Sequence, residues 1–128
     1  MPFVREPVDY SYSVRFVRSD AIGVSEHGVK EHVITHSFYL APDQLVEDWS
    51  PRTAAELQPD DLDGLLALQP EVILLGTGDT QQFPPVAVMA ACLTRGVGIE
   101  VMDNAAAART FSVLANESRR VVAGFLLR

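Results

Sequence analysis

Residues 72–85 read VILLGTGDTQQFPP, so a run of apolar residues leads directly into two glycines, a hydroxyl group and a carboxylate. Many α/β proteins build a phosphate or cofactor site from a buried strand that ends in glycines just before a helix. The turn Gly76-Thr77-Gly78-Asp79 lacks the third glycine of the dinucleotide fingerprint and the lysine of the phosphate-binding loop. No basic residue lies between Glu71 and Thr94, and the carboxylate of Asp79 would repel a phosphate. We interpret the glycines as a tight turn and expect no bound nucleotide.

A second polar group follows the next predicted strand. Met102-Asp103-Asn104 ends the apolar stretch 98–102, and Arg109-Thr110 lies one to two turns into the helix behind it. Ligands of open α/β sheets bind in the crevice beyond the carboxyl ends of the strands. The two strand ends therefore predict one crevice, formed by Gly76, Thr77, Gly78, Asp79, Met102, Asp103, Asn104, Arg109 and Thr110. The alternative is that Asn104 caps the helix, Arg109 pairs with a nearby acid, and nothing binds.

Three histidines raise the question of a metal site. His32 and His36 would share one face of a strand, but His27 lies across a turn, and the acids nearby are Glu26 and Glu31. Metal ligands must converge and must be oriented by further hydrogen bonds. We therefore expect an exposed hairpin here, with no metal and no other cofactor.

No residue has the setting of a catalytic nucleophile. Ser25 and Ser37 lack the strand-turn-helix context of a nucleophile elbow. Cys92 lies within a predicted helix among small apolar residues, where a thiol is buried and inert. The sequence predicts no catalytic residue and favours a protein that is not an enzyme.

The N-terminal half has the pattern of antiparallel strands. Apolar and polar residues alternate through 12–40 with the period of a half-buried strand. One face of this pattern carries Tyr12, Val14 and Phe16 and, further on, Val33, Thr35, Ser37 and Tyr39. Glu26-His27-Gly28 predicts a hairpin turn in which Gly28 adopts a positive φ. A short extended segment at 44–49 and a helix at 60–68, with Pro59 in its first turn, complete this half.

The C-terminal half alternates strands with helices. Val72–Leu75 predicts a strand buried on both faces, and 98–102 predicts a second buried strand. The intervening helix starts at Pro84-Pro85, runs through Arg95 and stops at Gly96. Asn104 then caps a helix to about residue 117, and a last strand covers 121–127. With a parallel, right-handed first crossover, these elements predict a single three-layer α/β domain over 1–128, with a mixed central sheet, flanking helices and an N-terminal β-hairpin region.

Composition limits the class of protein. A length of 128 residues suits one domain, and a net charge of −7 argues against nucleic acid or an anionic membrane as a general partner. No apolar run approaches the roughly 18 residues of a membrane span. Met1-Pro2-Phe3 precedes mixed charges rather than the pattern of a signal peptide. The single Cys92 suits a reducing compartment, so we expect a soluble protein of the cytoplasm.

The C-terminal motifs together resemble a known family. PEVILLGTGDTQQFPP and RGVGIEVMDNAAAARTFSVLANESRRVVAGFLL are similar to a small domain family of largely uncharacterised bacterial and archaeal proteins. Its mitochondrial relatives include an assembly factor of respiratory complex I, NADH:ubiquinone oxidoreductase. Trp49, within the N-terminal β region, also fits this resemblance. Where relatives often read A-C-R-T-Y-N, this chain has residues 107–112 as AARTFS, so any role of that cysteine, tyrosine or asparagine is absent. The resemblance implies a three-layer α/β fold whose mixed central sheet has one antiparallel strand, and it brings no established catalytic activity.

The resemblance also bears on the predicted crevice. Residues that match the family pattern there are Gly76, Gly78, Met102, Asp103, Arg109 and Thr110. We predict a non-enzymatic module, similar to complex I assembly factors, that binds another protein or a small ligand with Arg109 as its hydrogen-bonding fork. The alternatives are an unrecognised enzyme that uses Asp79 or Asp103 as acid or base, and a purely architectural crevice. An enzyme should desolvate one of these carboxylates in a closed pocket, whereas a binding module should present an open groove or an apolar patch flanked by Arg109.

Overall fold

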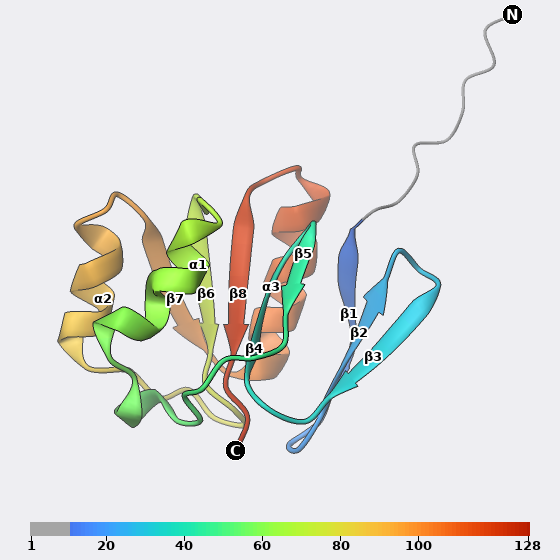
Figure 1. Ribbon diagram of the computed structural model, residues 1–128, viewed down its shortest axis with the longest axis horizontal. Coiled ribbons are helices and arrows are strands. Elements are labelled where there is room, and N and C mark those ends of the chain that lie inside the picture. Colours follow the sequence, from blue (N-terminus) through green and yellow to red (C-terminus); the bar gives the residue numbers. More distant parts are fainter. Residues whose placement is uncertain (1–10) are drawn as a thin grey trace, which may run out of the picture.

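The central element of the fold is a five-stranded mixed sheet. The computed structural model describes residues 11–128, and the order of the strands in this sheet is β5-β4-β8-β6-β7 (Figure 1). The strands are β4 (Phe38–Ala41), β5 (Gln44–Val46), β6 (Val72–Gly76), β7 (Gly98–Met102) and β8 (Val121–Phe125). β6 is parallel to both β7 and β8, whereas β4 is antiparallel to both β8 and β5. The mixed sheet with one antiparallel strand is therefore confirmed.

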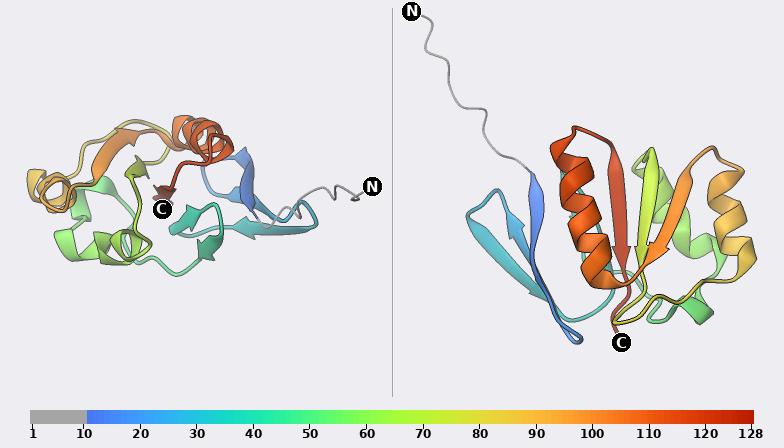
Figure 2. Two further views of the ribbon diagram at one scale, coloured as in Figure 1. Left: turned by 90° about the horizontal axis from the view of Figure 1, so that it is seen from above. Right: turned by 180° about the vertical axis from the view of Figure 1, so that it is seen from behind.

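Helices and a second sheet cover the two faces of this central sheet. One face packs against two short 3-10 helices, η1 (Ala54–Glu56) and η2 (Pro59–Leu62), and two α-helices, α1 (Asp63–Ala67) and α2 (Val86–Leu93). The other face packs against α3 (Asn104–Asn116) and a three-stranded antiparallel sheet. The strands of that smaller sheet are β1 (Tyr12–Val17), β2 (Ile22–Glu26) and β3 (Lys30–Ile34). Seen from behind, α3 lies between β8 and the smaller sheet, which completes the predicted three-layer arrangement (Figure 2).

The apolar run of β6 shows why this strand lies at the centre. Successive side chains of a strand point to opposite faces, so Ile73 and Leu75 join the core under α1 and α2, while Val72 and Leu74 join the core under α3. All four side chains are buried. Complete burial of such a side chain contributes about 1.5–3 kcal/mol, and a strand that fills two cores has no face left for polar residues.

Several predicted boundaries differ from the structure. The alternation predicted for 33–39 is wrong in phase, because β3 ends at Ile34 and its inward positions are His32 and Ile34, which leaves Val33 59% exposed. The predicted strand at 98–102 has the right bounds, but β7 is an edge strand whose side chains alternate between buried and exposed. The segment predicted at 44–49 contains only a short strand, which ends at Val46.

The predicted helices differ mainly in length. The helix predicted at 60–68 is a 3-10 turn followed by the short α1, with Pro59 in the first turn as expected. The helix predicted from Pro84-Pro85 through Arg95 is α2, which is shorter at both ends, and the chain turns at Gly96 with a φ of +75°. The last strand ends at Phe125, two residues before the predicted end. Within residues 11–128, no helix combines the length and the apolar character needed to cross a membrane. The segment that bears on a signal peptide, 1–3, lies outside the described residues.

Candidate functional site

The two glycines after β6 are required for two different reasons. A Cβ atom on Gly76 would overlap the Oδ1 atom of Asn104, so the backbone of β6 passes directly against this side chain. Gly78 has open space around it, but its φ is +101°, a backbone conformation that is unfavourable for residues with a Cβ atom. The positive φ of Gly78 agrees with the interpretation of these glycines as a tight turn.

Thr77 holds the turn together rather than facing a ligand. Its backbone N–H donates to the carbonyl of Met102 at 2.9 Å, which joins the carboxyl ends of β6 and β7. Its hydroxyl donates to the carbonyl of Thr80 at 2.7 Å and accepts the backbone N–H of Gln82 at 3.0 Å. The side chain is buried. The polar groups of Thr77 and the carbonyl of Met102 are therefore part of the scaffold of the crevice.

Asp103, not Asn104, caps α3. The Oδ1 atom of Asp103 accepts the backbone N–H of Ala106 at 2.8 Å, so the sequence-based assignment of the cap to Asn104 is wrong by one residue. Asn104 is buried in the first turn, where its Nδ2 donates to the carbonyl of Leu126 at 3.0 Å and its backbone N–H donates to the carbonyl of Gly78 at 2.8 Å. Leu126 in turn donates its backbone N–H to the carbonyl of Gly76 at 2.9 Å. Asn104 thus connects the ends of β6, β8 and α3.

Beyond these strand ends lies a polar hollow of about 230 Å³, termed here the strand-end hollow. Its lining residues are Ser19, Arg52, Thr53, Thr77, Gly78, Asp79, Thr80, Gln82, Leu126 and Arg128. The sequence predicted the contributions of Thr77, Gly78 and Asp79. It did not predict Arg52 or Arg128, because both lie far along the chain from the segment between Glu71 and Thr94 that holds the glycines. A second hollow, of about 280 Å³, shares Ser19, Gly78 and Asp79 and is bordered by Arg18 and Asp103.

Arg109 does not lie in the predicted crevice. It is exposed on α3 and lines a different depression, of about 310 Å³, between this helix and β1. This depression, termed the β1–α3 groove, is lined by Val14, Arg15, Phe16, Val17, Ala105, Ala108, Arg109 and Ser112. Thr110 is half-buried on the same helix and lines neither hollow at the strand ends. Arg109 and Thr110, which lie more than one turn beyond the start of α3, are therefore not among the residues that line the hollows at the strand ends.

A β-bulge shapes the β1 side of this groove. The register between β1 and β2 shifts between Val14 and Phe16, so Arg15 has no partner residue on β2. Bulges of this kind redirect side chains and increase the local twist. The guanidinium of Arg18 lies 4.7 Å from the centre of the Phe16 ring and stacks over it. The groove therefore has an apolar floor and arginines at its edge.

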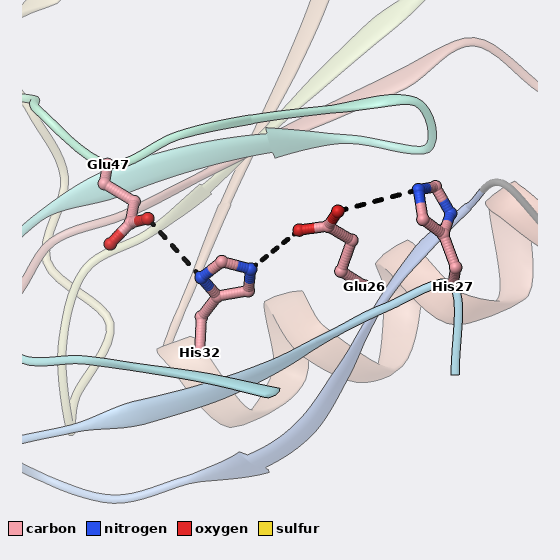
Figure 3. A network of polar contacts seen from close by, with 4 residues as sticks. All are labelled: Glu26, His27, His32 and Glu47. Atoms are coloured by element: carbon pink, nitrogen blue, oxygen red, sulfur yellow. Dashed lines mark hydrogen bonds and ion pairs between the residues drawn. The ribbon is translucent and has the colours of Figure 1, made fainter. Parts of the chain in front are cut away.

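Two of the histidines form a network with two glutamates between the small sheet and the segment that follows β5. Figure 3 shows His32 between Glu26 and Glu47, with its Nε2 atom 2.8 Å from Glu26 and its Nδ1 atom 3.6 Å from Glu47. His27 lies on the other side of Glu26, with Nε2 3.8 Å from that carboxylate. The hydrogen bond from His32 is the main cause that holds the pKa of Glu26 below its ordinary value. His36 is exposed beyond the end of β3, so the predicted pairing of His32 with His36 on one strand face is wrong.

These groups do not make a recognisable metal centre. Among residues 11–128, no group of three or more histidine, cysteine or acidic side chains is arranged to hold a metal ion. Cys92 is buried on α2, and burial raises the pKa of its thiol. A buried thiol with a raised pKa is a poor nucleophile because the thiolate is the reactive form.

Comparisons with known proteins place this geometry in a wider group. Residues 19–126 match the model of a protein family described as "Protein of unknown function (DUF498/DUF598)". A 60-residue stretch is 38% identical to the "13 kDa major membrane protein" of Francisella tularensis subsp. holarctica (strain LVS) and covers 47% of this chain and 49% of that protein. Over 82 residues the chain is 30% identical to NADH dehydrogenase (ubiquinone) 1 alpha subcomplex assembly factor 3 of Homo sapiens, which covers 62% of this chain and 44% of that protein. The chain thus spans about half the length of these curated relatives.

Solved structures share the fold. An NMR structure of a Xanthomonas campestris protein is 49% identical, with a TM-score of 0.81 over 99% of this chain and 92% of the other. The solution structure of a Bordetella pertussis protein, described as an Mth938-like domain, is 27% identical, with a TM-score of 0.77 over 98% of this chain and 92% of the other. The α/β fold and the family resemblance inferred from the motifs are both confirmed.

Proposed function

We propose that this chain, which belongs to the DUF498/DUF598 family of proteins of unknown function, is a non-enzymatic module that binds another protein. Its human relative is named as an assembly factor, and a role of the same kind, in which the chain holds a subunit during assembly of a larger complex, is the function proposed here. The β1–α3 groove is the observation that carries this proposal.

The groove has the composition of a protein-binding surface. Its floor consists of apolar side chains from two elements, with Val14 and Phe16 on β1 and Ala108 on α3. These side chains are only partly buried. A depression of about 310 Å³ is large enough for one or two side chains of a partner. Apolar centres with a polar rim are typical of interfaces, where a few anchors contribute most of the binding free energy.

The charges at the rim specify the kind of partner. Arg15 and Arg109 line the groove and, among residues 11–128, no acidic residue does, although the whole chain carries a net charge of −7. Within the described part of the chain, neither guanidinium lies within ion-pair distance of a carboxylate. A guanidinium binds a carboxylate through two parallel hydrogen bonds. The partner is therefore a protein segment with an apolar anchor flanked by aspartate or glutamate.

An enzyme that uses Asp79 or Asp103 with Arg109 is less well supported. Asp79 is exposed, and the carboxylate of Asp103 caps α3. Arg109 lines the β1–α3 groove rather than the hollows that these carboxylates border. The three side chains do not surround one reacting centre. We place the binding function in the cytoplasm, in keeping with the reduced, buried thiol of Cys92.

Site-specific crosslinking followed by reconstitution tests this proposal. A photo-crosslinking residue at Ala105, which lines the groove, should capture a partner that the same residue at the exposed Ala90 on α2 does not. With that partner purified, Arg109→Ala should weaken binding by about tenfold or more, because a charge-assisted hydrogen bond contributes about 1.5–3 kcal/mol. The melting temperature should not change, since Arg109 is exposed. Arg95→Ala, which removes an exposed cation outside the groove, is the control.

Two outcomes would contradict the proposal. One is capture of the same partner from Ala90 and Ala105 alike. The other is an affinity that is unchanged in both Arg15→Ala and Arg109→Ala. Restoration of binding when Arg109→Glu is combined with a lysine in place of a partner carboxylate would establish the contact directly.

A further inference from the structure

The strand-end hollow has features that the proposed protein-binding function does not use. It shares no lining residue with the β1–α3 groove. Four separate segments contribute to it, at residues 19, 52–53, 77–82 and 126–128, and they meet beyond the carboxyl ends of β6 and β8. This is the edge at which open α/β sheets bind their ligands.

Two arginines, Arg52 and Arg128, line the hollow. The side-chain ion pairs of arginine found in residues 11–128 join Arg119 to Glu71 and Arg120 to Asp43, so they engage neither Arg52 nor Arg128. The loop that carries Arg52 is held in place, because the carboxylate of Glu56 accepts the backbone N–H groups of Arg52 and Thr53. These hydrogen bonds and the charge of Arg52 lower the pKa of Glu56, but within residues 11–128 neither Arg52 nor Arg128 is in a side-chain ion pair. In a chain with a net charge of −7, two such guanidinium groups at one hollow indicate an anionic ligand.

The turn after β6 adds hydrogen-bond donors. Gly78, Asp79 and Thr80 line the hollow, and their backbone N–H groups donate to no acceptor in the part of the chain that the structure describes. The φ of Gly78 is +101°, and a turn with residues at positive φ can present successive N–H groups to an anion. The hydroxyl groups of Ser19, Thr53 and Thr80 further increase the polarity of the lining.

Asp79 and the volume of the strand-end hollow limit the class of ligand. Within the part of the chain that the structure describes, Asp79 is the acidic residue that lines the hollow, and it would repel an anion that had nothing to donate in return. A ligand with a hydroxyl or ammonium group beside its anionic group satisfies both charges. The hollow, at about 230 Å³, is smaller than the roughly 300–1,000 Å³ of pockets for drug-sized ligands, which favours a compact molecule over a nucleotide.

We propose that the strand-end hollow binds a small molecule through an oxyanion, a carboxylate or a phosphate, which Arg52 and Arg128 hold while a neighbouring hydroxyl or ammonium group donates to Asp79. The oxyanion lies between the two guanidinium groups, each of which can donate two parallel hydrogen bonds. The backbone N–H groups of the turn donate to its remaining lone pairs.

A titration followed by NMR on ¹⁵N-labelled protein tests the site with four probes: acetate, inorganic phosphate, L-serine and glycerol 3-phosphate. The amide signals of Gly78, Asp79 and Thr80 should shift saturably. L-serine should bind more tightly than acetate, and glycerol 3-phosphate more tightly than inorganic phosphate, because the first member of each pair carries a donor beside its oxyanion that can reach Asp79. Acetate has no donor, and the P–OH groups of inorganic phosphate belong to the oxyanion that the arginines hold. The tighter of these two preferred probes identifies the oxyanion as carboxylate or phosphate.

Variants separate the roles of the charges. Arg52→Gln and Arg128→Ala should each lower the affinity for the preferred probe by about tenfold, as expected for loss of a charge-assisted hydrogen bond. Asp79→Asn should strengthen binding of acetate and inorganic phosphate and should abolish the advantage of the donor-bearing probes. Arg109→Ala is the matched control, and it should leave all four titrations unchanged because it lies in the other groove.

The proposal would be overturned by the absence of saturable shifts at about 10 mM of any probe, a concentration well above the dissociation constant of even a millimolar site. It would also be overturned if Arg128→Ala, at an exposed position where loss of folding is not expected, bound every probe as the wild type does. Because the control variant removes the protein-binding arginine, failure here is distinguishable from failure of the proposed protein-binding function.

Discussion

Gly76 and Asn104 depend on each other at the scale of single residues. Alanine at Gly76 would push its Cβ atom into the Oδ1 atom of Asn104, and moving that side chain breaks its buried hydrogen bond to the carbonyl of Leu126. A buried polar group left unsatisfied costs about 1–3 kcal/mol. We therefore expect Gly76→Ala to lower the free energy of unfolding by about 2 kcal/mol in urea denaturation. Gly78→Ala should cost about 1 kcal/mol, through its positive φ alone.

A double-mutant cycle checks that cause. If the Asn104 side chain is the obstacle, the loss in the Gly76→Ala and Asn104→Ala double variant should be smaller than the sum of the two single losses. Gly78→Ala should instead add to Asn104→Ala without coupling, because nothing lies within 4 Å of a Cβ atom at this position. Strict additivity at Gly76 would show that the close approach to Asn104 is not what requires glycine there.

The Glu26–His32 pair predicts how the stability of the fold depends on pH. The pKa of Glu26 is lowered, mainly by the hydrogen bond from His32, so the folded state binds a proton at this group less readily than the unfolded state does. A carboxyl group with a depressed pKa stabilises the fold at pH values above its unfolded pKa, and this stabilisation is lost as the pH falls through the folded pKa. Thermal unfolding should therefore show Glu26→Gln melting below the wild type at pH 6 and the two melting together near pH 3. A deficit of the same size at both values would mean that the charge of Glu26 is not responsible.

At the scale of elements, the start of α3 shows what a local pattern can and cannot predict. The helix start near residue 104 was predicted correctly, but the cap was assigned to Asn104 and is Asp103, because aspartate and asparagine are nearly equal as N-caps and a local pattern does not separate two adjacent candidates. The fold decides between them, because Asn104 is drawn into its contacts with Leu126 and Gly78 while Asp103 is left to cap. The same reasoning applies to β3, where the inward phase is set by packing against the rest of the small sheet and not by the alternation alone.

This assignment of the cap predicts a graded effect at one position. Asp103→Ala should lower the free energy of unfolding by about 1 kcal/mol, since it removes the acceptor for the Ala106 N–H, whereas Asp103→Asn should retain most of the stability. Urea denaturation of the two variants gives the comparison. Equal losses in both would indicate that the charge of Asp103 matters at the helix terminus and that the capping hydrogen bond does not.

At the scale of the whole molecule, the predicted fold was more complete than the predicted site. The apolar run of β6 and the helix signals around it specify a layered α/β fold locally, so they can be seen in the sequence. The strand-end hollow depends on Arg52 and Arg128, which are far apart along the chain and meet only through the order β5-β4-β8-β6-β7. Arg109 was assigned to the crevice by its distance along the chain from Asp103, but the direction of α3 carries it towards β1 instead.

The charges and the arrangement of the histidines together predict that the protein does not bind nucleotides or transition metals at micromolar concentration. The net charge of −7 disfavours the approach of a polyphosphate, and the carboxylate of Asp79 borders both hollows at the strand ends. His32 is engaged by Glu26, while His36 is exposed beyond the end of β3, so the imidazole groups do not converge. Elemental analysis of untagged protein should find no stoichiometric metal, and thermal-shift measurements with zinc, nickel, ATP and NADH should leave the melting temperature unchanged. A ligand present at about 100 times its dissociation constant would stabilise the fold by about 2.7 kcal/mol. A clear upward shift with ATP or NADH would therefore contradict the role given to the charges, and one with zinc or nickel would show that the histidines converge after all.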